Sequence, residues 1–299
     1  MRGVFTALVT PFNSNNELDL EAFKRILLDQ QNAGVAGVIP CGTTGESPTL
    51  SRDEKKKLIS TALQTLKGSG VKVLAGTGTN DTAETVEFSR WASEQGVDGL
   101  LVVTPYYNKP SQAGLTAHFR AVADAVRCEV MLYNVPGRTG VSLTAETVTQ
   151  LAQHPRITSI KEATSNVAFA SEILEQLRNS QCAMTLLSGD DAAYLPLLSV
   201  GAHGVVSVAS NLFPRAMVAI QKNFAAGRVA EAASLHQRFY PLFRDLFIDS
   251  NPGPIKHAMS YAGWCDARLR PPLAMLSAEH RQKLETSLRA CGVSAGSLL

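Results

Sequence analysis

Long apolar runs are missing from this sequence. Nowhere do about 18 apolar residues follow one another, the length that a membrane-spanning helix needs. The first residues, Met1 to Ala7, lead directly into a short strand-like segment, without the long apolar stretch of a secretory signal. We therefore expect no membrane partner and a cytoplasmic location.

Clustered cysteines are missing as well. The five cysteines are odd in number and far apart, and no C-x-x-C or Cys/His cluster occurs. This spacing argues against structural zinc and against a disulfide framework. It fits a reduced compartment, and we expect no metal site.

Neither sign of charge dominates the sequence. The chain has 28 basic and 26 acidic residues, a net charge of +2, and no basic block, so nucleic acid is not an expected partner. A hydrophobic content of 45% with 18% charged residues is typical of a globular protein with a sizeable core. With 299 residues, the chain can form one large domain or two small ones.

Strand-like and helical segments alternate regularly along most of the chain. The expected strands are residues 4–9, 35–40, 71–75, 99–103, 129–133, 157–163, 184–188 and 204–208. The expected helices are residues 19–33, 51–66, 82–94, 115–126, 144–153, 167–178, 191–200 and 215–226. Alternation of this kind predicts a parallel sheet covered by helices, and its natural closed form is a (β/α)8 TIM barrel over residues 1–227.

The last part of the chain, residues 228–299, shows a different pattern. Helical spacing continues over residues 229–247, 254–261 and 278–290, but no further strands occur. The barrel does not require these segments. We expect a C-terminal helical region that is either a small appended domain or an oligomer surface.

Lys161 lies near the end of the short, β-branched strand expected at residues 157–163. One interpretation is that its side chain extends into solvent where the strand ends. The other is a buried amine, because burial disfavours the charged ammonium form and leaves a nucleophile that can attack a carbonyl carbon. This strand alone does not decide between the two.

Other chemistry-bearing residues also follow expected strands, and the carboxyl ends of the strands are where a barrel of this kind has its active site. The Gly-Thr-Thr-Gly sequence at residues 42–45 is either an ordinary turn or a row of N–H donors for a small anion. Tyr133 either fills the core or supplies a hydroxyl beside a lysine amine. Arg138 is either a loop arginine or a planar fork for a carboxylate.

Taken together, these motifs resemble the dihydrodipicolinate synthase/N-acetylneuraminate lyase family of class I aldolase barrels, over nearly the whole chain. The matching sequences are Gly-Thr-Thr-Gly-Glu at residues 42–46 and the segment from Tyr133 to Lys161. The resemblance implies that Lys161 forms a Schiff base with pyruvate. It also implies that Tyr133 relays protons through Thr43, and that Tyr107 reaches this relay from a neighbouring subunit.

The resemblance implies substrate-binding residues too. Thr43 and Thr44 would hold the pyruvate carboxylate, with the backbone near Val206 beside it. Gly189 by itself indicates only a strand-to-helix turn, but on the resemblance we also assign it to substrate binding. Arg138 would hold the carboxylate of aspartate semialdehyde, since sialic acid lyases of the family generally lack this arginine.

The implied reaction is condensation of pyruvate with L-aspartate 4-semialdehyde in lysine/diaminopimelate biosynthesis, without a cofactor and in a homotetramer built as a dimer of dimers. One alternative is an aldolase that cleaves a 2-keto-3-deoxy sugar acid, or an N-acetylneuraminate lyase-type enzyme. A more remote alternative is a non-catalytic pyruvate-binding regulator. Such a regulator is expected to lose Tyr133 or Thr43, and both are present.

Many family members bind lysine as a feedback inhibitor at the tight dimer interface. The residues that match this effector site are Ser47, Asn80, Glu84 and Tyr106. Three neighbouring positions depart from the inhibited members, which often carry an alanine and neutral or titratable side chains there. These departures are Pro48, Arg52 and Lys55.

We predict that free lysine inhibits this protein weakly or not at all. Arg52 and Lys55 are one turn apart on an expected helix, so they share a face. Each positive charge opposes a cationic ligand by about 1 kcal/mol, at roughly 4–6 Å and an effective dielectric of 20–80. Together this is at least about tenfold in affinity. A steady-state assay at saturating pyruvate checks the prediction, and half-inhibition by sub-millimolar lysine contradicts it.

Overall fold

A closed barrel of parallel strands forms the centre of the fold in the computed structural model, which describes residues 1–297. Within that range eight strands follow one another in the order β1 to β8. They are β1 (Gly3–Ala7), β2 (Gly37–Ile39), β3 (Lys72–Gly76), β4 (Gly99–Val103), β5 (Glu129–Asn134), β6 (Ile157–Glu162), β7 (Thr185–Ser188) and β8 (Gly204–Ser207). The predicted (β/α)8 barrel is confirmed.

The chain divides into two compact units. The first consists of Met1–Gly3 and Lys72–Val206, and the second of Val4–Val71 and the described part of Ser207–Leu299. The described part of residues 228–299 therefore groups with most of the first strand, the second strand and their helices. The predicted boundary at residue 227 stays a prediction.

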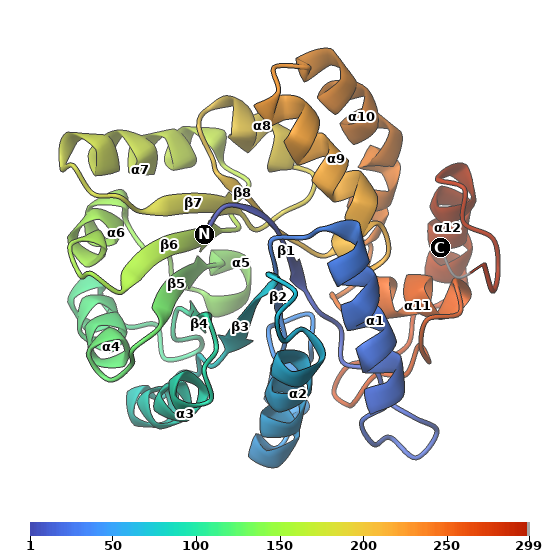
Figure 1. The fold of residues 1–299 in the computed structure, drawn as a ribbon, viewed down its shortest axis with the longest axis horizontal. Helices are drawn as coiled ribbons and strands as arrows, with labels where there is room; N and C mark the ends of the chain where they lie inside the picture. The colour runs from blue at the N-terminus through green and yellow to red at the C-terminus, as the bar shows by residue number, and fades with distance from the viewer. Residues whose placement is uncertain (298–299) are drawn as a thin grey trace. The chain divides into compact units, whose positions relative to one another are not determined.

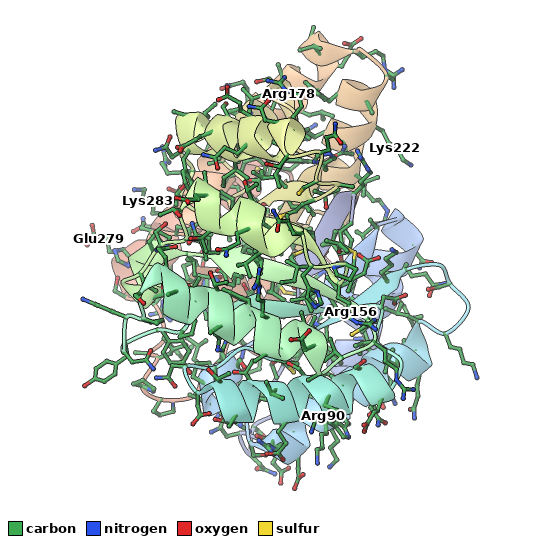
Figure 2. The ribbon with its side chains drawn as sticks, turned by 90° about the vertical axis from the view of Figure 1, so that its left-hand side faces the viewer. Arg90, Arg156, Arg178, Lys222, Glu279 and Lys283 are labelled. Carbon is green, nitrogen blue, oxygen red and sulfur yellow. The ribbon has the colours of Figure 1, made fainter. Side chains whose placement is uncertain are left out.

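In the first unit, the amphipathic helices α3 (Thr82–Glu94), α4 (Gln112–Asp124), α6 (Ala145–Ala152) and α7 (Val167–Asn179) cover the strands. Two shorter helices, α5 (Pro136–Thr139) and α8 (Tyr194–Ser199), also belong to this unit. In α7 the buried residues Ala170, Ile173 and Leu177 recur at helical spacing, so one face packs inward. Figure 1 shows α3, α4, α6 and α7 outside the strands β3 to β7, and Figure 2 shows Arg90 and Arg178 on the outer side of this layer.

Three helix predictions in this unit need correction. Helix α4 begins at Gln112 rather than 115, because the Ser111 side chain accepts a hydrogen bond from the N–H of Gly114 and caps the helix. Helix α8 covers only Tyr194–Ser199, not 191–200. Helix α5 was not predicted, since a Pro-Gly sequence usually indicates a turn.

The second unit contains the remaining helices. They are α1 (Leu20–Ala33), α2 (Arg52–Thr65), α9 (Pro214–Ala225), α10 (Val229–Asp245), α11 (Gly253–Tyr261) and α12 (Ala278–Ala290), with short 3-10 helices η1 (Ser47–Thr49) and η2 (Ala209–Asn211). Figure 1 shows α9 and α10 side by side. The expected start of α2 is confirmed, because Ser51 and Glu54 form a reciprocal capping box.

A buried ion pair links α11 to the turn that follows β2. Lys256 Nζ lies 2.7 Å from a carboxylate oxygen of Glu46, and both side chains are fully buried. The ammonium also lies 4.2 Å from the centre of the Phe12 ring, and the backbone N–H of Arg270 donates to the second Glu46 oxygen at 2.9 Å. Burial lowers the pKa of Lys256, and the nearby Glu46 carboxylate opposes this shift. The C-terminal helices therefore have a role that the sequence did not indicate.

We predict that Lys256→Met lowers the free energy of unfolding by about 3–5 kcal/mol, because it leaves the Glu46 carboxylate buried without its cation. Lys24 is the matched control. Its ammonium also lies 2.8 Å from a carboxylate, that of Glu21, but both side chains are exposed. Lys24→Met is expected to cost less than about 1 kcal/mol. Chemical denaturation measures both variants, and equal losses contradict the prediction.

Candidate active site

Lys161 lies on β6 in the first unit, and its side chain is only 4% exposed. Strand β6 pairs with β5 so that Lys161 is opposite Tyr133, which is also buried. The Lys161 Nζ atom lies 4.2 Å from the centre of the Tyr133 ring. This placement rules out the interpretation of Lys161 as a solvent-exposed lysine at a strand end. It also places the Lys161 amino group beside the ring of a phenol.

The next residues on the same two strands hold this register in place. Asn134 donates through Nδ2 to the Glu162 carboxylate at 2.7 Å and accepts from the Leu143 N–H at 3.0 Å. Glu162 also accepts from the Thr164 N–H at 2.6 Å. Burial raises the pKa of Glu162, and the hydrogen bonds from Thr164 and Asn134 partly offset the rise. The sequence pattern indicates no role for Asn134 or Glu162, although each directly follows a predicted site residue.

Gly189, after β7, is in close contact with the lysine strand. A Cβ atom at this position would lie 2.5 Å from the Ala163 Cβ and 3.1 Å from the Lys161 Cε. Both distances are shorter than normal carbon contacts. The absence of a side chain at residue 189 therefore leaves space for the aliphatic part of the Lys161 side chain. This close packing explains why residue 189 is a glycine, which the turn alone does not.

Arg138 is on α5, the short helix that follows β5. The helix begins with Pro136 and ends at Gly140, whose φ of 71° is left-handed. Thr139 is buried, accepts from the Thr104 hydroxyl at 3.2 Å and donates to the Val141 carbonyl at 2.9 Å. The buried threonine thus anchors the helix, while Arg138 itself lies on its exposed side.

The loop after β4 carries Tyr106 and Tyr107. Tyr107 has a left-handed φ of 72° and is 88% exposed. Nearby, the Asn108 side chain donates to the Asn80 carbonyl at 2.8 Å, and Tyr106 also contacts the Asn80 backbone. Burial and the Glu84 carboxylate raise the pKa of Tyr106. The structure thus brings together three predicted effector residues, Asn80, Glu84 and Tyr106, and their effector role stays a prediction.

The turn after β2 belongs to the second unit and carries Thr43, Thr44 and Ser47. The N–H of Gly45 donates to the Gly42 carbonyl, and the N–H of Glu46 donates to the Thr43 carbonyl, each at 3.1 Å. These two donors therefore close the turn on itself instead of facing an anion. Thr44 is buried and its hydroxyl accepts from the Asn251 side chain at 3.0 Å.

Val206, also assigned from the resemblance, is fully buried on β8. Its role stays a prediction, as do those of Thr43, Thr44 and Ser47. Among residues 1–297, no three His, Cys, Asp or Glu side chains are grouped so that they could hold a metal ion. No helix in the described part of the chain is both long and apolar enough to cross a membrane.

Comparison with known proteins agrees with these motifs. The model of the dihydrodipicolinate synthetase family matches residues 1–291. The chain belongs to this family. The 4-hydroxy-tetrahydrodipicolinate synthase of Leptospira biflexa is 48% identical over 276 residues, which are 92% of each chain, and that of Magnetococcus marinus is 45% identical over 96% and 97% of the two chains.

Solved structures of the family have the same fold. The 4-hydroxy-tetrahydrodipicolinate synthase from the methanotroph Methylacidiphilum fumariolicum is 44% identical, with a TM-score of 0.94 over 98% of this chain and 96% of that one. The similarity therefore extends over the whole barrel and the C-terminal helices. The family resemblance of the sequence motifs is confirmed.

We predict that Gly189→Ala lowers both turnover and stability, because its methyl group would overlap Ala163 and press on the Lys161 stem. Overpacking of this kind costs about 1–3 kcal/mol. Gly137→Ala is the matched control, since within the described residues nothing lies within 4 Å of a Cβ there. Turnover and thermal unfolding are measured for both. Equal behaviour of the two variants contradicts a packing role for Gly189.

Proposed function

We propose that this chain is a lyase that condenses pyruvate with L-aspartate 4-semialdehyde to 4-hydroxy-tetrahydrodipicolinate, a step of lysine/diaminopimelate biosynthesis. The observation that carries the proposal is a buried lysine amine over the Tyr133 ring at a strand end. It occurs in a chain whose relatives at 42–48% identity are named for this reaction. A nucleophilic lysine can activate a keto acid without a metal or an organic cofactor.

The chemistry proceeds through a covalent intermediate. The neutral Lys161 amine attacks the keto carbon of pyruvate, and loss of water gives a Schiff base. Loss of a methyl proton then gives an enamine, whose carbon attacks the aldehyde of aspartate semialdehyde. The amine of the second substrate finally adds to the Schiff-base carbon and displaces Lys161, which closes the ring and restores the free enzyme.

Each step needs a proton donor or acceptor near Lys161. Tyr133 is the nearest candidate, because its ring lies 4.2 Å from the Lys161 Nζ atom and a phenol can both donate and accept a proton. We assign Thr43 and Tyr107 to the same relay and Thr44 to the pyruvate carboxylate, on the family pattern. Val206 and Gly189 complete the pyruvate site in this assignment.

Tyr107 also bears on the oligomeric state. Its side chain is 88% exposed, so the ring is accessible to a second copy of the chain. Its assigned role requires a second copy of the chain, and we propose a homotetramer built from two dimers. We also propose a cytoplasmic location, where the pathway's small, soluble substrates are present.

A second function, cleavage of a 2-keto-3-deoxy sugar acid, would use the same enamine. The names of the relatives do not favour it, and the guanidinium of Arg138 suits a carboxylate on the second substrate better than a sugar chain. Turnover measured with aspartate semialdehyde and with sugar-derived aldehydes separates the two. Faster turnover with the sugar aldehydes overturns the proposed function.

We predict that Arg138→Ala lowers kcat/KM for aspartate semialdehyde by about 100-fold, because a charge-assisted, bidentate contact is lost. Schiff-base formation with pyruvate should remain close to that of the unchanged protein. Arg138→Lys retains the positive charge but not the planar, bidentate guanidinium, so its kcat/KM should lie between those of Arg138→Ala and the unchanged protein. If Arg138→Ala loses pyruvate binding to the same extent, the residue is structural.

A further inference from the structure

The hydroxyl of Thr44 has a buried partner from a distant part of the sequence. Asn251, in the loop before α11, donates through Nδ2 to the Thr44 Oγ1 at 3.0 Å, across 207 residues of sequence. Asn251 is 5% exposed and Thr44 2% exposed. Both residues belong to the second unit. This buried hydrogen bond restricts the orientation of the Thr44 hydroxyl group.

The direction of this hydrogen bond determines what Thr44 can do next. An amide NH2 group only donates, so the Thr44 oxygen must accept from Asn251. A threonine hydroxyl has a single hydrogen, and that hydrogen remains for a different acceptor. A carboxylate only accepts hydrogen bonds. The polarity of the Asn251–Thr44 contact therefore matches a carboxylate as the second partner of Thr44.

We propose that Asn251 is a positioning residue that makes Thr44 a hydrogen-bond donor to the carboxylate of pyruvate. This role rests on the proposed function, in which Thr44 holds that carboxylate. Asn251 does not touch the reacting atoms. It restricts the rotation of one hydroxyl group before the substrate arrives, so this freedom is not lost during binding.

The surrounding contacts keep Asn251 and Thr44 in place. Two residues after Thr44, the Glu46 carboxylate accepts from Lys256 at 2.7 Å, and Lys256 is five residues after Asn251. The backbone N–H of Arg270 binds the same carboxylate at 2.9 Å. The turn and the segment from Asn251 to Lys256 are therefore joined at two points, which holds the amide against the hydroxyl.

The test is a double-mutant cycle on pyruvate binding. Borohydride trapping of the pyruvate adduct is followed at increasing pyruvate concentration in the full chain with Asn251→Ala, Thr44→Val and both substitutions. We expect Asn251→Ala alone to raise the half-saturating pyruvate concentration by about tenfold, as expected for one well-placed hydrogen bond to a charged group. In the Thr44→Val background, the same substitution should change it by less than about twofold, because the hydroxyl is gone.

A second variant tests whether weaker pyruvate binding in Asn251→Ala reflects only a general structural change. Asn251→Asp preserves the shape of the side chain but replaces the donor with an acceptor, so it should capture the Thr44 hydrogen and weaken pyruvate binding at least as much as Asn251→Ala. The KM for aspartate semialdehyde should stay within about twofold in each folded variant that changes Asn251 alone.

Each outcome decides the matter. Unchanged pyruvate binding in Asn251→Ala or Asn251→Asp overturns the role of Asn251, as does an equal effect with and without the Thr44 hydroxyl. If the unchanged protein traps no pyruvate at all, the proposed function fails, and this role of Asn251 fails with it. If the unchanged protein traps pyruvate and the Asn251 variants bind it equally well, only the positioning role is refuted and the proposed function stands.

Discussion

Parallel pairing of β5 with β6 is the constraint on which the first unit's site depends. The pairing places Tyr133 opposite Lys161 and Asn134 opposite Glu162. A shift by one residue would turn the lysine to the opposite face of the strand. The buried hydrogen bond of 2.7 Å from Asn134 to Glu162 opposes this shift, because a slipped register would leave both groups buried without their partners. Asn134 and Glu162 thus keep Tyr133 and Lys161, the residues proposed to act on pyruvate, opposite each other.

Two buried lysines in this chain each lie 4.2 Å from the centre of an aromatic ring, Lys256 at Phe12 and Lys161 at Tyr133, but Lys256 is also paired with a carboxylate. Lys256 lies 2.7 Å from the Glu46 carboxylate and ties the turn after β2 to α11. Lys161 lies over an aromatic ring, with Gly189 leaving space for its stem. A paired ammonium serves well as a structural link but is a poor nucleophile, since its lone pair carries a proton. The surroundings of each lysine therefore fit a different task.

The sequence predicted the barrel because each strand is short and apolar and each helix has regular spacing. It also placed Lys161 and Tyr133 near the ends of two strands and Arg138 shortly after one of them, and their chemical roles stay predictions. It missed α5 because a Pro-Gly sequence indicates a turn, and α5 is held by the buried Thr139 instead. The contacts from Asn251 to Thr44 and from Lys256 to Glu46 could not be predicted, because local patterns carry no information about partners more than 200 residues away.

The central claim is that Lys161 is the amine that binds pyruvate. The most direct measurement is borohydride reduction in the presence of pyruvate, followed by mass spectrometry of the intact chain and of its peptides. We expect one reduced adduct per chain, located on Lys161, and none in Lys161→Arg. An adduct on Lys256 or any other lysine, or an unmodified chain, would contradict the claim.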